Sequence, residues 1–241
     1  MMPQGRRRSS YFQLSRSPQY SFVFAIPLLL AYEGFALFLN HSDLYGIRNS
    51  ADVFLKLFLA YVGIHGFFGF GAAILLAFFL FRYLGGVPRL GPLRAGFFGL
   101  MLGESLVYSL LLGTVVARVT HMLLAQPLSL SRPAQILVSL GAGIYEEFVF
   151  RVLLLTILIF LLQRLLRFQH VVASGVAALL GAFLFSAFHY IGPFGDVFYM
   201  PSFLFRFLAG LVLTGLYLAR GYGVTAYTHS LYDLWVTFGI I

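Results

Sequence analysis

The sequence of 241 residues contains no cysteine and has few charged residues of any kind. The lack of cysteine excludes disulfide bonds, thiolate metal ligands and a cysteine nucleophile. Charged residues make up 10% of the chain and hydrophobic residues 60%, whereas a soluble domain carries roughly 25% charged residues. A chain this poor in charge is predicted to be an integral membrane protein that crosses the bilayer several times.

The net charge of +8 comes almost entirely from arginine, because Lys56 is the only lysine. The arginines lie in short loops between apolar stretches, so the predicted partner is the lipid bilayer and no nucleic-acid partner is expected. With seven crossings, most arginines fall on the side of the N-terminus, which is therefore predicted to be cytoplasmic, with an external C-terminus. The small size without a soluble domain favours a bacterial inner membrane.

Seven apolar stretches reach the length of about 20 residues that a membrane-spanning helix needs. They cover residues 20–40, 54–82, 95–117, 134–163, 171–190, 201–219 and 223–241. We therefore predict an all-α fold, a polytopic transmembrane helical bundle with seven spans. The second stretch is too long for one straight crossing. An interfacial helix followed by a span, with a bend near Gly66, Gly69 and Gly71, would raise the count to eight.

No internal repeat, low-complexity tract or soluble domain divides the chain. Residues 1–19 are predicted to form a basic cytoplasmic segment, in which residues 6–8 are all arginine. The apolar run that follows lacks a small-residue cleavage site and is expected to be retained as the first helix. Residues 20–241 are predicted to form a single transmembrane domain, with the functional core at residues 134–241.

The apolar stretch at residues 134–163 carries three charged residues close together, Glu146, Glu147 and Arg151. Each charge costs roughly 2.5–3.5 kcal/mol at bilayer depth, so such residues are functional by default. Glu147 and Arg151 are four residues apart with the acid first, which favours an ion pair on one helix face. Glu146 then points elsewhere and is free to act as a general base or acid. Alternatively, Glu146 is also paired and only anchors helices.

Two of the apolar stretches that follow residues 134–163 carry histidine. His189 ends the fifth stretch, where a lone histidine is more often structural. His229 and Asp233 are four residues apart in the last stretch, so Asp233 could hold the tautomer of His229, or the two form a structural pair. A bundle satisfies polar groups at bilayer depth mainly by gathering them around one cavity. We therefore expect the polar residues of these three spans to converge.

Three motifs occur in order, each on its own apolar stretch: Glu146-Glu147-x-x-x-Arg151, Phe185-x-x-x-His189 and His229-x-x-x-Asp233. Each motif alone is weak, but the ordered set resembles the CAAX-protease and bacteriocin-processing family of intramembrane endopeptidases. That family includes the type II CAAX prenyl endopeptidases, and the resemblance covers residues 134–241. It implies a multi-pass membrane hydrolase that cuts a peptide bond near the membrane surface with an activated water, and without a covalent intermediate.

The resemblance also implies a role for each motif residue. Glu146 would be the general base that activates the water, with His189 assisting it. Glu147 and Arg151 would order the site. His229, together with the acid four positions after it, would stabilise the oxyanion.

Many members of the family have asparagine where this chain has Asp233. An ionised aspartate cannot donate a hydrogen bond to an oxyanion. Asp233 is therefore protonated, or orients His229, or belongs to a metal site. If the enzyme is metal-dependent, Glu146, His189 and His229 are the candidate ligands of zinc or another divalent metal. We expect no cofactor, because one base with histidine donors suffices for attack by water.

The expected partner of such an enzyme is a peptide or membrane-protein substrate. Two other functions stay open at this point. A protein of the same fold could be a non-proteolytic membrane scaffold or immunity protein, in which the motifs only bind. A proton-coupled transporter could use the same acids and histidines as a relay, although transporters commonly contain internal repeats and none is found.

The depth of the two histidines imposes a condition on the fold. If the spans alternate strictly, His189 and His229 approach opposite faces of the membrane. They meet only if the fifth helix ends inside the bilayer, at Gly192-Pro193. The following segment, residues 194–201, is then expected to form part of the wall of the site, since irregular backbone at depth is tolerated where it lines a cavity.

Glu33, Glu104 and Arg206 also lie within predicted spans. The expectation for all three is structural pairing or the lining of a cavity. Arg206 could alternatively bind the C-terminal carboxylate of a substrate.

Overall fold

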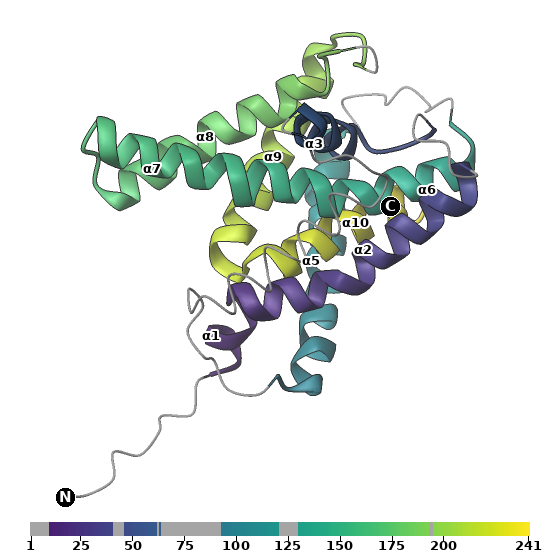
Figure 1. The fold of residues 1–241 in the computed structure, drawn as a ribbon, viewed down its shortest axis with the longest axis horizontal. Helices are drawn as coiled ribbons and strands as arrows, with labels where there is room; N and C mark the ends of the chain where they lie inside the picture. The colour runs from purple at the N-terminus through teal and green to yellow at the C-terminus, as the bar shows by residue number, and fades with distance from the viewer. Residues whose placement is uncertain (1–9, 41–45, 62, 64–92, 121–129, 193–194) are drawn as a thin grey trace, which may run out of the picture.

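A computed structural model describes residues 10–40, 46–61, 63, 93–120, 130–192 and 195–241. Every regular element in those ranges is a helix, as Figure 1 shows. The α-helices are α1 (Tyr11–Ser15), α2 (Pro18–Asn40), α3 (Ser50–Tyr61), α5 (Ala95–Thr120), α6 (Arg132–Gly141), α7 (Leu155–Leu165), α8 (His170–Phe188), α9 (Met200–Arg220) and α10 (Tyr222–Phe238), and the π-helices are η1 (Ala142–Glu146) and η2 (Phe148–Leu154). The all-α prediction is confirmed for this part of the chain.

Five helical segments among the described residues are long and apolar enough to cross a membrane. They are Pro18–Asn40, Ala95–Val115, Arg132–Leu165, His170–Phe188 and Met200–Arg220. Each coincides with one of the predicted spans. The protein is therefore an integral membrane protein, and five of the seven predicted spans are confirmed as helices of sufficient length.

The count of seven is not confirmed, because the other two spans differ from the prediction or are only partly described. Of residues 54–82, the described part is the end of α3 and residue 63. The expected bend at Gly66, Gly69 and Gly71 lies outside the described residues. The last span corresponds to α10, which has 17 residues. At 1.5 Å per residue such a helix is about 26 Å long, shorter than a hydrocarbon core of about 30 Å.

The predicted span at residues 134–163 is one continuous helical segment from Arg132 to Leu165, made of α6, η1, η2 and α7. Its middle part is π-helical, over Ala142–Glu146 and Phe148–Leu154. π-Helical turns are rare and occur frequently at functional sites. Glu146 lies in the first of these turns, Arg151 in the second, and Glu147 between them.

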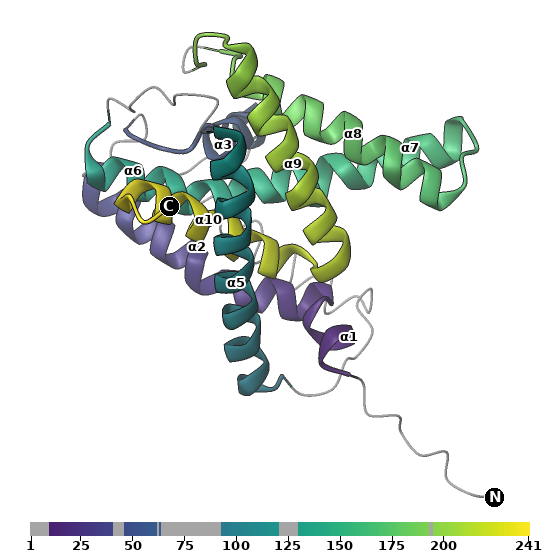
Figure 2. The ribbon, with the colours of Figure 1, turned by 180° about the vertical axis from the view of Figure 1, so that it is seen from behind.

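Helix α10 occupies the middle of the bundle. It packs against α2, α5, α6, η1 and α9. In Figure 2, α5 passes across α10, and α2 and α6 lie on its other side. Val224, Thr225 and His229 on α10 are buried. This position brings the motif histidine of the last helix against η1.

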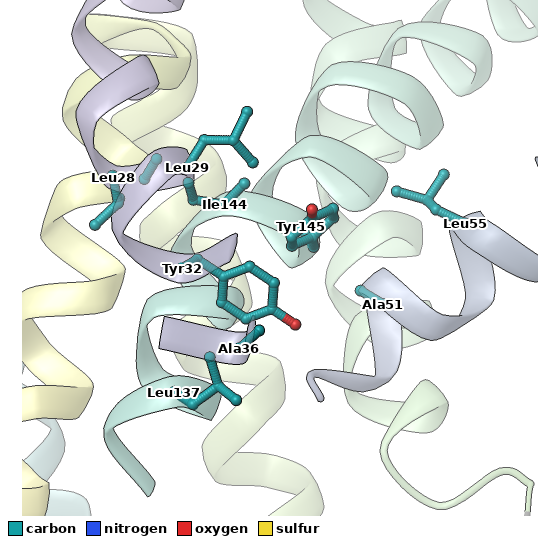
Figure 3. Close-up of a cluster of buried hydrophobic side chains, with 10 residues drawn as sticks. Leu28, Leu29, Tyr32, Ala36, Ala51, Leu55, Leu137, Ile144 and Tyr145 are labelled. Atoms are coloured by element: carbon teal, nitrogen blue, oxygen red, sulfur yellow. The ribbon is translucent and has the colours of Figure 1, made fainter. Parts of the chain in front are cut away.

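A cluster of buried apolar side chains joins α2, α3 and η1 (Figure 3). Its members are Leu28, Leu29, Tyr32 and Ala36 of α2, Ala51 and Leu55 of α3, Leu137 of α6, Ile144 and Tyr145 of η1, and Ala226 of α10. The rings of Tyr32 and Tyr145 meet edge to face, with their centres 5.1 Å apart. The short helix α3 is thereby held against the π-helical turn.

Glu104 and the segment before α2 are joined through Arg220, the last residue of α9. Arg220 donates to Glu104 at 2.8 Å and to Ser15 of α1 at 2.9 Å. Its guanidinium group also lies 4.6 Å from the centre of the Phe12 ring. Glu104 is thus in a structural pair, as expected, and residues 1–19 include a short helix packed on the bundle, which their composition did not indicate.

The contact between η1 and α10 depends on Gly143. A Cβ atom at this position would lie 2.1 Å from the carbonyl oxygen of Ala226 and 2.1 Å from Ser230 Oγ. Gly143→Ala should therefore lower the free energy of unfolding by about 1–3 kcal/mol, the usual cost of overpacking. Gly175→Ala in α8, where no atom lies within 4 Å, is the matched control and should be neutral or stabilising. Thermal unfolding in detergent measures both, and equal melting temperatures would contradict the close contact.

Candidate active site

Glu147 is the residue through which two of the three motifs meet. Its Oε1 accepts a hydrogen bond from His229 Nδ1 at 2.7 Å and lies 3.1 Å from Arg151 Nη1. The second contact is the ion pair that the four-residue spacing predicts. Glu147 is 0% exposed and Arg151 is 1% exposed. The two charges therefore neutralise each other where an unpaired charge would cost several kcal/mol.

Arg151 connects this ion pair to two other helices. Its Nη2 donates to the carbonyl oxygen of Gly210 in α9 at 3.4 Å. Its guanidinium carbon lies 4.4 Å from the centre of the Phe185 ring in α8, within the range of a cation–π interaction. Arg151 thus contacts both α8, which precedes His189, and α9, which follows it.

Glu146 makes a separate set of contacts. Its Oε1 accepts a hydrogen bond from Asn49 Nδ2 at 2.8 Å, and its Oε2 lies 3.8 Å from His189 Nε2. The expectation that Glu146 and Glu147 have different partners is met. The expectation that Glu146 is free of partners is wrong, because Asn49 reaches it from the start of α3.

His189 immediately follows α8, which ends at Phe188, before the predicted break at Gly192-Pro193. Its Nδ1 lies 2.8 Å from the carbonyl oxygen of Phe185. A carbonyl only accepts, so Nδ1 carries the proton, and in the neutral ring Nε2 is an acceptor. This nitrogen and Glu146 Oε2 face each other across 3.8 Å. That separation is too long for a hydrogen bond, but one water can bridge it by donating to both atoms.

Asp233 does not fix the tautomer of His229. Its Oδ2 lies 3.7 Å from His229 Nε2, beyond hydrogen-bonding distance. The hydrogen bond that fixes the ring is made by its other nitrogen, Nδ1, which donates to Glu147. The prediction that Asp233 orients His229 is therefore wrong, because a carboxylate from the neighbouring helix performs that task.

The candidate site is more accessible on one side. The side chains of His189 and Asp233 are 23% and 28% exposed, whereas that of Glu147 is 0% exposed. Glu146 lies between these extremes, at 10%. A molecule that approaches from outside would therefore reach Glu146 past His189 and Asp233, with the ion pair behind them.

The segment after α8 was predicted to enter the bundle, but it does not. Residues 195–200 are exposed, and residues 193–194 lie outside the described part of the chain. The backbone N–H of Asp196 donates to the carbonyl oxygen of His189 at 2.8 Å, so the segment borders the site from outside. The carboxylate of Asp196 pairs with Arg206, which is the structural pairing expected for that arginine.

The candidate metal ligands do not form a three-ligand set. Across the residues that the structure describes, no three His, Asp or Glu side chains are grouped so that they could hold a metal ion. Glu146 faces His189, while His229 contacts Glu147 with one nitrogen and faces Asp233 with the other. This arrangement does not fit a zinc site with three protein ligands.

Asn49 is the site residue that the sequence analysis missed. It precedes Glu146 by 97 positions and lies outside all three motifs. Asn-Ser at positions 49–50, just before an apolar run, is a typical start of a helix. That signal could have placed Asn49 at the beginning of α3, but no local pattern indicates the contact with Glu146.

Fold and site together define a polytopic, all-helical membrane protein with a buried Glu–Arg–His centre and a second glutamate beside a partly exposed histidine. Residues 129–235 match the sequence model of the family described as "Type II CAAX prenyl endopeptidase Rce1-like". The matched range contains all three motifs, so this part of the chain is similar to the Rce1-like membrane proteases. Neither the curated proteins nor the solved structures gave a match.

The ion pair at the centre of the site is testable through stability. Arg151→Met leaves Glu147 buried without its countercharge and should lower the free energy of unfolding by about 3–5 kcal/mol. Adding Glu147→Gln should recover part of that loss, because glutamine is neutral and its oxygen still accepts from His229. Thermal unfolding of both single variants and the double variant gives their coupling energy. Strictly additive effects would contradict the ion pair.

Proposed function

We propose that this chain is an intramembrane endopeptidase in which Glu146 and His189 activate a water molecule. The observation that carries the proposal is the 3.8 Å gap between Glu146 Oε2 and His189 Nε2. One atom comes from η1 and the other from the residue that follows α8, and both lie at the accessible side of the site. The match of residues 129–235 to a family of proteases supports the same conclusion.

In the proposed reaction one water lies between Glu146 and His189. Both facing atoms are acceptors, so the water donates its two hydrogens to them and keeps its lone pairs for the substrate. As the water oxygen attacks the carbonyl carbon, Glu146 takes a proton as general base. The proton then passes to the leaving nitrogen as the C–N bond breaks, and the products are a carboxylic acid and an amine.

His229 is proposed to stabilise the oxyanion that forms during this attack. Its Nδ1 is held by Glu147, which leaves Nε2 directed toward the side of Asp233 and the site's accessible edge. Because Nδ1 donates to Glu147, Nε2 is a donor only when both ring nitrogens carry a proton, so the proposed form of His229 is the imidazolium. A donor held rigidly before the reaction stabilises developing charge without a reorganisation cost. Glu147 and Arg151 act by fixing the ring of His229. Asp233, on the other side of that ring, is proposed to influence its charge.

The proposed substrate is a peptide or a membrane-protein segment presented near the membrane surface. Prenylated CAAX tails, which the description of the family names, are one class to include in a substrate screen. We place the protein in a bacterial inner membrane with a cytoplasmic N-terminus, an orientation supported by the arginines on that side.

The general-base role predicts the behaviour of Glu146→Gln. Glutamine is nearly isosteric and can still accept from Asn49, but it cannot take a proton from water. Cleavage of an internally quenched peptide library by the purified protein in lipid nanodiscs should fall by a factor of about 100 or more. The measurement is the rise of fluorescence with time.

The matched control is Glu104→Gln, which makes the same chemical change at an acid paired with Arg220, outside the site. This variant should cleave the library at nearly the rate of the wild type. Undiminished cleavage by Glu146→Gln would refute the assignment of the base. A wild-type protein that cleaves nothing but still binds library peptides would favour the scaffold function.

The proposal also predicts that catalysis does not need a metal ion. The wild-type protein, treated with EDTA and 1,10-phenanthroline and then desalted, should keep its cleavage rate within about twofold, because water is activated by protein side chains alone. Added zinc should not raise the rate. Loss of cleavage that is restored by zinc or another divalent metal would contradict the metal-free mechanism while leaving the endopeptidase activity in place.

A further inference from the structure

Asn49 contacts the proposed general base from a part of the chain that precedes the region matching the family model, residues 129–235. We infer that Asn49 is a positioning residue: α3 holds its carboxamide against Glu146 Oε1, so that Oε2 alone faces His189. The inference rests on the proposed function and extends the site to α3. It gives a functional reason for the packing of this short helix.

The orientation of the carboxamide of Asn49 follows from its two neighbours. Its Oδ1 lies 2.9 Å from the backbone nitrogen of Ala51. That N–H group only donates, so the atom facing it must be the oxygen. The other end is then the NH₂ group, which donates to Glu146 Oε1 at 2.8 Å. A hydrogen bond to a carboxylate is among the stronger ones, and Asn49 is only 2% exposed.

Asn49 is also the N-cap residue of α3. Its carbonyl oxygen accepts from the backbone N–H of Val53 at 3.1 Å, which begins the helix. The N-terminus of a helix carries a partial positive charge that favours a nearby carboxylate. Both the side chain of Asn49 and the end of the helix it caps therefore favour the observed place of Glu146 Oε1.

A buried network keeps Asn49 in place. Tyr32 Oη accepts from the backbone N–H of Asn49 at 3.2 Å and donates to Asp52 at 2.8 Å. Asp52 in turn pairs with Arg48 at 2.6 Å and with Lys56 at 2.7 Å. Figure 3 shows the oxygen of Tyr32 directed toward the start of α3, near Ala51. Rotation of α3 about its axis would break several of these contacts at once.

Gly141 of α6 closes the other side of Asn49. A Cβ atom at Gly141 would lie 2.6 Å from Asn49 Cβ and 2.7 Å from Tyr32 Cε2. The absence of a side chain therefore lets α6 approach the cap of α3 directly. Asn49 is confined by α2, α6 and its own helix, with its NH₂ group directed at Glu146.

Two variants separate the capping role of Asn49 from its role as a donor. Asn49→Ser keeps a good N-cap residue, but its side chain is too short to replace the donor to Glu146. Asn49→Asp keeps the shape and the cap but has an acceptor in place of the NH₂ group. The matched control is Asn40→Ser, because among the described residues the carboxamide of Asn40 bonds to the backbone of Ile47, at 3.0 and 2.9 Å, and not to Glu146.

The variants are compared in nanodiscs on a peptide that the wild-type protein cleaves from the quenched library. For Asn49→Ser and Asn49→Asp, kcat should fall by about 10- to 100-fold, the effect of one hydrogen bond to a charged group. KM should stay within about twofold, since the substrate itself is not contacted. Asn49→Ser should still fold and melt cooperatively, whereas Asn49→Asp places a second buried carboxylate beside Glu146 and should melt at a lower temperature. All properties of Asn40→Ser should match the wild type. A wild-type kcat in Asn49→Ser would overturn the inference.

A second readout does not depend on cleavage. The infrared band of the Glu146 carboxyl group is identified as the one missing in Glu146→Gln. It should shift in Asn49→Ser and stay in place in Asn40→Ser. If the wild type cleaves no peptide while the band shifts as expected, the proposed function fails and the positioning contact stands. An unshifted band in Asn49→Ser overturns the positioning role in either case.

Discussion

The carboxylate of Glu147 is the constraint on which the arrangement of the helices depends. A charge in a membrane-embedded bundle must find a partner, because desolvation costs several kcal/mol per ion. Glu147 has two partners on the same oxygen, Arg151 from its own segment and His229 from α10. Arg151 extends the connection to α8 and α9 through Phe185 and Gly210. One shared oxygen thus links the helices that carry the three motifs.

The two adjacent glutamates have different surroundings and, in our account, different tasks. Glu147 is fully enclosed and holds charges in place. Glu146 is held on one oxygen by Asn49, and its other oxygen faces His189 at the accessible edge. Two neighbouring carboxyl groups with different partners are a common way to divide roles within one site. The π-helical turns around these residues fit the frequent occurrence of such turns at functional sites.

Features that depend on local sequence could be predicted. Of the seven spans that the apolar runs predicted, five are helices long enough to span the membrane. The spacing of Glu147 and Arg151 predicted their ion pair. The cost of charge at bilayer depth predicted that polar residues of separate spans gather, as Glu147 and His229 do.

Features that depend on contacts between distant segments could not be predicted in the same way. Asn49 reaches Glu146 across 97 positions, and its sequence neighbourhood indicates only the start of a helix. Spacing suggested Asp233 as the partner of His229, but packing of η1 on α10 brings Glu147 to that ring instead. The early end of α10 is, by contrast, a local feature, because Gly239 has a left-handed backbone and ends the helix.

The proton on His229 Nδ1 gives the most direct test of the shared carboxylate. In protein labelled with ¹⁵N-histidine, the signal of His229 among those of the six histidines is the one that disappears when His229 is replaced. The account predicts that Nδ1 of His229 is protonated and strongly hydrogen bonded, and that Glu147→Gln weakens this bond. An Nδ1 without a proton, or one whose signal is the same in Glu147→Gln, would contradict the account.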